Sequence, residues 1–111
     1  MYTITGKVIK GDGYGKKLGF PTVNLDAQIE SKALSGVYGG KAILDDVVYK
    51  AGIVINDAGR IEAHLIGYSR DAYGREVTLQ INKFLREYKK FNTEQKLIAQ
   101  IKKDLIICSQ A

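Results

Sequence analysis

The fold is decided by residues 36–55, which read GVYGGKAILDDVVYKAGIVI. Two apolar runs, 36–44 and 47–55, stand on either side of Asp45-Asp46, and both contain β-branched and aromatic residues. Runs of this length and composition, separated by two turn-forming residues, predict two antiparallel strands joined by a tight turn. We therefore expect a β-hairpin at the centre of the chain.

The same pattern continues on both sides of this hairpin. A turn signal at 56–59 precedes residues 60–66, where apolar and polar side chains alternate. Similar alternation occurs over 2–8 and, after another turn at 71–74, over 77–82. Five or six short strands with tight connections are typical of an antiparallel sandwich or barrel.

The apolar period changes near the C-terminal end. Leu97, Ile101 and Leu105 repeat every four residues, as on one face of a helix. Asn92, with Gln95 three residues later, resembles a capping box. We predict one amphipathic helix from about 93 to 107, lying on the strands. Because the helix follows the strands, no βαβ unit is available for a Rossmann fold.

Length, charge and rare residues limit the remaining possibilities. The chain has 111 residues, which we read as one domain over 1–111, and a net charge of +5. The ends are basic, with +3 over 1–20 and +4 over 83–111, whereas 21–82 carries −2. This distribution suits a small anionic ligand at least as well as nucleic acid.

One cysteine and one histidine argue against a disulfide or a structural zinc site, and no run is long enough to span a membrane. We expect a cytoplasmic monomer.

Residues 11–21, GDGYGKKLGFP, are rich in glycine. Four glycines and a proline predict a long loop without regular structure. Exposed backbone N–H groups and neighbouring lysines suit a phosphate, although the spacing matches no P-loop or dinucleotide motif and a plain flexible connection is the alternative. The candidate phosphate-binding residues here are Gly11, Gly13, Gly15, Lys16 and Lys17.

Thr22 and Asn24 follow directly. In an extended backbone both side chains point to the same side, so that a hydroxyl and an amide oxygen converge. Such neutral oxygen ligands would hold Mg²⁺ only together with phosphate groups, for instance those of ATP. The alternative is a turn in which both side chains bind backbone groups.

The glycine-rich stretch and the residues around it resemble those of a known family. Residues 6–25, GKVIKGDGYGKKLGFPTVNL, resemble the opening of the riboflavin kinase (flavokinase) domain, which in bacteria often forms the C-terminal half of a bifunctional riboflavin kinase/FAD synthetase. Further stretches fit the same pattern in the same order, so the resemblance covers nearly the whole chain: 35–38, 61–65, 71–74, 84–87, 90–91 and 100–104. It implies an all-β fold with one C-terminal helix, a six-stranded antiparallel Greek-key β-barrel.

The resemblance also implies a function, the Mg²⁺-dependent transfer of the ATP γ-phosphate to the 5′-hydroxyl of riboflavin, giving FMN and ADP. It implies that the glycine loop and Thr22 bind the nucleotide phosphates, that Thr22 and Asn24 hold Mg²⁺, and that Glu62 is the catalytic carboxylate. Arg86 falls in the segment that approaches the flavin. The alternative for Glu62 is an exposed charge on a strand, and we take His64 as its neighbour.

Two further alternatives stay open. Arg86 has a second interpretation as a surface ion pair with Glu87 or Asp104. The hairpin before Glu62, residues 56–60, is shorter than is usual in the family, where an Ile-Gly and a Pro-Thr pair occur. This shortening favours a second hypothesis, a barrel that binds a flavin or a nucleotide without turnover and has a regulatory role. A nucleic-acid-binding barrel is supported by charge alone, so we do not expect a nucleic-acid partner.

Overall fold

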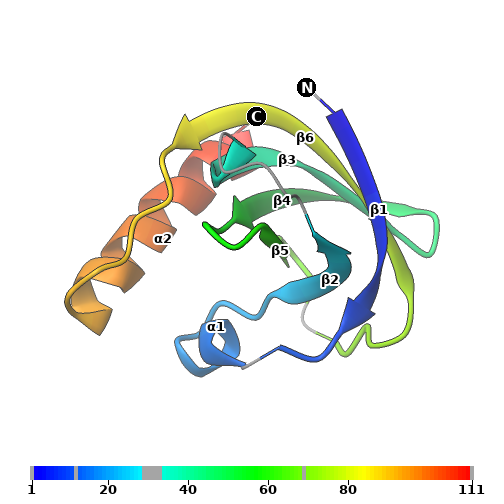
Figure 1. Cartoon of the computed structure of the whole chain (residues 1–111), viewed down its shortest axis with the longest axis horizontal. Helices are drawn as coiled ribbons and strands as arrows, with labels where there is room; N and C mark the ends of the chain where they lie inside the picture. Colours follow the sequence, from blue (N-terminus) through cyan, green and yellow to red (C-terminus); the bar gives the residue numbers. More distant parts are fainter. Residues whose placement is uncertain (1, 12, 29–33, 69, 111) are drawn as a thin grey trace.

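The structure is a computed structural model that describes residues 2–11, 13–28, 34–68 and 70–110 (Figure 1). Asp12, in the glycine-rich stretch, lies outside the described residues. Over the described part, the chain forms six strands and two helices: β1 (Tyr2–Ile9), α1 (Tyr14–Lys17), β2 (Val23–Gln28), β3 (Gly36–Leu44), β4 (Val47–Ile55), β5 (Arg60–Leu65), β6 (Glu76–Arg86) and α2 (Glu94–Gln110).

The strands form a closed antiparallel barrel in the order β1-β2-β5-β4-β3-β6, with β6 pairing back onto β1. Strands β3, β4 and β5 follow one another as hairpins, and β6 returns to lie beside β3. This arrangement is a Greek key. The expected six-stranded antiparallel Greek-key barrel with a C-terminal helix is therefore confirmed.

The central hairpin has the register that its sequence predicts. Strands β3 and β4 pair without a break from Gly36 opposite Ile55 to Leu44 opposite Val47. Asp45 and Asp46 form the turn with φ angles of 51° and 65°. Two successive positive φ angles are the mark of the mirror-image two-residue turn, whose twist matches that of the flanking strands.

Alternation along the strands separates a buried interior from a polar outer wall. On β5, Ile61, Ala63 and Leu65 are buried, whereas the intervening side chains face outward. Burying an aliphatic side chain of this size contributes about 1.5–3 kcal/mol, so the interior layer is the main source of stability. Its largest fully buried members are Leu44, Ile53, Ile55, Ile61, Leu65, Val77, Leu79 and Ile81.

Helix α2 packs against the outside of β4 and β3, along one side of the barrel in Figure 1. The hydroxyl oxygen of Thr93 accepts a hydrogen bond from the backbone N–H of Lys96 (3.2 Å), so Thr93 caps the helix. The expected capping box from Asn92 to Gln95 is therefore wrong, and the helix runs three residues past the predicted end.

The stripe of Leu97, Ile101 and Leu105 is only half-buried. Within α2, the buried side chains are instead those of Asp104 and Cys108. The reason is that the stripe does not seal against the barrel but faces a pocket, described below. Within the described residues, neither helix combines the length and the apolar character that crossing a membrane requires.

The glycine-rich stretch differs from its prediction, because it contains one helical turn, α1. The backbone N–H of Lys17 donates to the carbonyl of Gly13 (3.1 Å), and that of Gly19 donates to the carbonyl of Lys16 (3.0 Å). Gly13 and Gly19 have φ angles of 71° and 93°, which glycine adopts without strain. The positive φ angles at Gly13 and Gly19 change the chain direction on either side of α1. The glycines therefore lie at the ends of this helical turn and do not prevent it.

Candidate functional site

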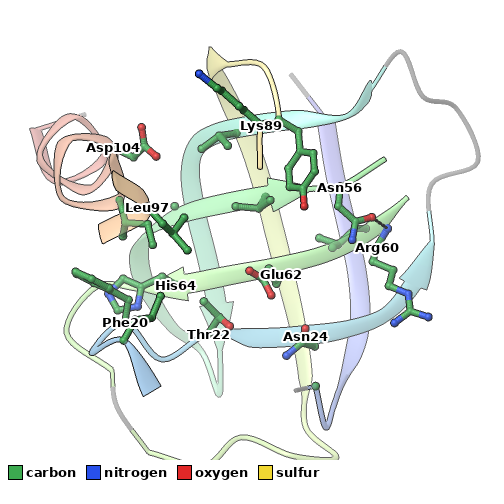
Figure 2. A pocket seen from close by; sticks show the side chains of 18 of the residues that line it. Phe20, Thr22, Asn24, Asn56, Arg60, Glu62, His64, Lys89, Leu97 and Asp104 are labelled. Atoms are coloured by element: carbon green, nitrogen blue, oxygen red, sulfur yellow. Dashed lines mark hydrogen bonds between the residues drawn. The ribbon is translucent and has the colours of Figure 1, made fainter. Parts of the chain in front are cut away.

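A pocket of about 820 Å³ lies on the outer wall of the barrel, where β2, β5 and β4 run side by side (Figure 2). The loop before β2 lines one side, α2 lines another, and the segment 88–91 lines a third. A volume of this size is within the usual range for small-molecule sites. The pocket has a polar part over β2 and β5 and an apolar part beside α2.

The polar part is set by the register between β2 and β5. Asn24 lies directly opposite Glu62 across the ladder, and Thr22 precedes Asn24 by two residues, so it points to the same side. Figure 2 shows all three side chains directed into the same space. Arg60 and His64 share the face of β5 that carries Glu62 and also line the pocket. The sequence-predicted group of Thr22, Asn24 and Glu62 is thus brought together.

Gly11 brings the backbone close to this group. A Cβ atom at position 11 would collide with the side-chain amide of Asn24, so any larger residue would require this amide or the loop to shift. The loop therefore passes against Asn24 with its own backbone, and Gly11 lines the pocket.

His64 supports the entry to β2. Its Nδ1 donates a hydrogen bond to the carbonyl oxygen of Pro21 (2.6 Å), and the ring of Phe20 packs edge-on against it with centroids 6.3 Å apart. Since Pro21 precedes Thr22, this contact fixes the backbone that carries the Thr22 hydroxyl. The geometry thus makes His64 a neighbour that positions the loop.

The apolar part of the pocket lies between α2 and the barrel. Leu97, Ile101 and Leu105 line it from the helix, and Val54 and Val37 line it from β4 and β3. Side chains of this kind on two opposing surfaces suit a flat, largely apolar ring system.

Arg86 does not act alone in this region. Its Nε donates to both carboxylate oxygens of Asp104 (3.2 Å each) and its Nη2 to Oδ2 (2.9 Å), while Gln100 donates to Oδ1 (3.0 Å). Its Nη1 donates to the carbonyl of Glu87 (3.2 Å), and its guanidinium lies 5.5 Å from the ring centre of Phe91. The ion pair with Asp104, the second interpretation of Arg86, is therefore present, and Asp104 is 7% exposed rather than at the surface. Arg86 also lines the pocket, and its contact with a flavin stays a prediction.

Among the predicted phosphate-binding residues whose surroundings the structure describes, those that do not line the pocket are Gly13, Lys16 and Lys17. The surroundings of Gly15 lie outside the described part. The lysines are exposed on α1, at the edge of the site, so their role stays a prediction. The basic side chains that do line the pocket, besides Arg86, are Lys10, Arg60, Lys89 and Lys90.

Several lining residues were not among the predicted site residues, Asn56 and Tyr88 among them. Asn56 accepts hydrogen bonds on Oδ1 from the backbone N–H groups of Ala58 and Arg60 (3.0 Å each), which holds the short hairpin before β5. The turn signal at 56–59 predicted this bend but not that it borders a pocket. Tyr88 had no signal, because its segment is irregular and its position depends on the whole fold.

The polar donors fit a magnesium ion bound together with phosphates. The hydroxyl of Thr22 and the amide oxygen of Asn24 are hard, neutral oxygen ligands. Among the described residues, no three His, Cys, Asp or Glu side chains cluster as a self-sufficient metal site. The negative charge that Mg²⁺ prefers would therefore come from the nucleotide.

The family model and the curated relatives point to one family. The family model described as riboflavin kinase, or flavokinase, matches residues 1–111. The chain is 35% identical over 113 residues to the RNA-binding riboflavin kinase RibR of Bacillus subtilis, covering 95% of this chain and 49% of that protein. It is 31% identical over 112 residues to the bifunctional riboflavin kinase/FMN adenylyltransferase of Escherichia coli, covering 93% of this chain and 36% of that protein.

The crystal structure of riboflavin kinase from Trypanosoma brucei has the same fold, with a TM-score of 0.76 and 21% sequence identity, covering 97% of this chain and 74% of that chain. With the family model matching along its whole length, the chain belongs to the riboflavin kinase (flavokinase) family. It spans 49% of the length of RibR and 36% of the length of the bifunctional enzyme.

Proposed function

We propose that this domain transfers the γ-phosphate of ATP to the 5′-hydroxyl of riboflavin, giving FMN and ADP. The observation that carries the proposal is the pairing of Glu62 with Asn24 across β5 and β2, beside Thr22, at the polar part of a pocket whose other part is apolar. Family membership supports the same chemistry.

Each part of the pocket matches one part of the reaction. The apolar part beside α2 would take the isoalloxazine ring, which leaves the ribityl chain pointing toward Glu62. The carboxylate of Glu62 would accept the proton of the 5′-hydroxyl while the oxygen of that hydroxyl bonds to the γ-phosphorus. The bond from that phosphorus to the bridging oxygen breaks in the same transfer, and ADP leaves with the electron pair.

The nucleotide would lie over the loop before β2. The close approach of Gly11 and the basic side chains of Lys10 and Arg60 favour phosphate groups at this edge. Thr22 and Asn24 would hold Mg²⁺, which supplies charge neutralisation on the phosphates when bound. Positioning and charge are the main requirements of phosphoryl transfer, so few groups suffice.

A direct assay tests the proposal. The protein is incubated with riboflavin and Mg·ATP, and FMN is separated by chromatography. We expect stoichiometric FMN and ADP, and formation that stops when EDTA removes the metal. Absence of FMN at high protein concentration, with riboflavin bound, would overturn the proposal.

That last result would favour a second candidate, a barrel that binds flavin or nucleotide without turnover. The short hairpin held by Asn56 is the observation in its favour, because a short hairpin leaves less wall around the substrate. One relative, RibR, is named an RNA-binding riboflavin kinase. We do not expect this domain to bind RNA. Binding to RNA that survives moderate salt would contradict this expectation.

A further inference from the structure

Tyr88 lies in the irregular segment between β6 and α2 and is half-buried. It lines the main pocket and also a smaller hollow of about 360 Å³ beside Arg86 and Gln100. Of the described residues that line the main pocket, it is the one tyrosine. A phenol at this place offers an aromatic face and a hydroxyl that both donates and accepts hydrogen bonds.

Tyr88 shares the main pocket with Glu62 and Asn56. Burial raises the pKa of the phenol above its ordinary value, and the carboxylates of Asp57 and Glu62 raise it further. Asp57 is in the turn between β4 and β5, and Glu62 is on β5. Tyr88 thus lines, from the segment after β6, the same pocket that Glu62 lines from β5.

The segment that carries Tyr88 is held on both sides. Before it, Arg86 donates to the carbonyl of Glu87, and after it the ammonium of Lys89 lies 5.6 Å from the ring centre of Phe91. Figure 2 shows Lys89 on the far side of the pocket from Thr22 and Asn24. Tyr88 is the chain neighbour of Lys89, and both residues line the pocket.

We propose that Tyr88 is a specificity-determining residue, whose hydroxyl binds the ribityl chain of the flavin next to the hydroxyl that Glu62 deprotonates. This inference rests on the proposed function. A ribityl chain that runs from the apolar part of the pocket to Glu62 would pass the phenol of Tyr88. The phenol can both donate and accept hydrogen bonds, and so can each hydroxyl of the ribityl chain. The site then selects a flat ring with a polyhydroxylated chain over the ring alone.

The test compares two ligands and two matched variants. Riboflavin and lumiflavin share the ring system, but lumiflavin carries a methyl group in place of the ribityl chain. Their affinities are measured by flavin fluorescence for the wild type, Tyr88→Phe and Tyr73→Phe. Tyr73 is 58% exposed on the 71–74 turn and is outside the pocket lining, so its variant controls for loss of a phenol hydroxyl elsewhere.

We expect Tyr88→Phe to weaken riboflavin binding about fivefold and to leave lumiflavin binding unchanged, as the loss of one hydrogen bond to the chain requires. Tyr73→Phe should change neither affinity. Equal losses for both ligands, or no loss for riboflavin, would overturn the inference while leaving the proposed function intact. A wild type that binds no riboflavin and forms no FMN would overturn both.

Discussion

Arg86 at the end of β6 holds Asp104 in the middle of α2 through three hydrogen bonds, two from Nε and one from Nη2. The pair is largely enclosed, since the side chains are 22% and 9% exposed. It fixes the distance between the barrel and the helix, and with it the width of the apolar part of the pocket. Arg86 is therefore mainly a positioning residue, which acts by holding α2 against the barrel.

Arg86→Ala should therefore lower the free energy of unfolding by about 3 kcal/mol, because it leaves the carboxylate of Asp104 enclosed without its cation. Arg75→Ala is the matched control. It breaks the pair with Asp45, whose side chains are 51% and 57% exposed, and should cost less than about 1 kcal/mol. Urea denaturation measures both values. Equal losses would show that the Arg86 pair is no more structural than a surface pair.

Gly11→Ala should reduce the affinity for Mg·ATP at least tenfold, because the new methyl group displaces the Asn24 amide. Stability should change little, since the loop can shift outward. Calorimetric titration with a non-hydrolysable ATP analogue and Mg²⁺ measures the effect. Gly6→Ala is the control, because a Cβ there would meet atoms at ordinary distances of 3.4–3.5 Å. Unchanged nucleotide affinity in Gly11→Ala would contradict the role given to Asn24.

His64 offers a test of positioning by rescue. His64→Ala removes the hydrogen bond to Pro21 and should lower kcat about tenfold through the displacement of Thr22. His64→Asn places an amide N–H near the position of Nδ1 and should restore most of the rate, whereas His64→Gln should not. Steady-state FMN formation separates the three. A rate that is equally low in all of them would point instead to a catalytic role for the ring.

Cys108 should be unreactive in the folded protein. Its sulfur packs over β3 and β4, where a Cβ at Gly39 or Gly52 would lie 3.5 or 3.7 Å away. Burial raises the pKa of the thiol above its usual value, and the carboxylate of Asp104 raises it further. A higher pKa means less thiolate at pH 8, and the thiolate is the nucleophile. Reaction with DTNB should be at least 100-fold slower than in urea-unfolded protein. Equal rates would mean that α2 does not stay docked.

Much of the fold could be predicted, because its determinants are local. Asp45 and Asp46 form the tight turn that their position between two apolar runs predicts, and Asn56 and Gly59 form the next one. The barrel order itself came from the resemblance rather than from strand patterns, which do not reveal which strands are neighbours.

The site was predicted in part, because some of its residues lie in local sequence motifs and the others are brought together only by the fold. Thr22, Asn24 and Glu62 were identified through sequence motifs, and the register of β2 with β5 brings them together. The capping residue Thr93 was missed, because the choice between adjacent Asn92 and Thr93 depends on backbone angles. The pocket face of Leu97 was missed as well, since an apolar stripe looks the same whether it contacts a core or a ligand.

The most direct test of the central claim is the rate of FMN formation by Glu62→Gln at saturating riboflavin and Mg·ATP. The substitution keeps the size of the side chain but removes the proton acceptor. We predict a rate at least 100-fold below that of the wild type, with riboflavin affinity within about twofold, because a general base contributes roughly 10²–10⁴-fold. Glu76→Gln, at the exposed start of β6, should keep the wild-type rate. A wild-type rate in Glu62→Gln would contradict the account.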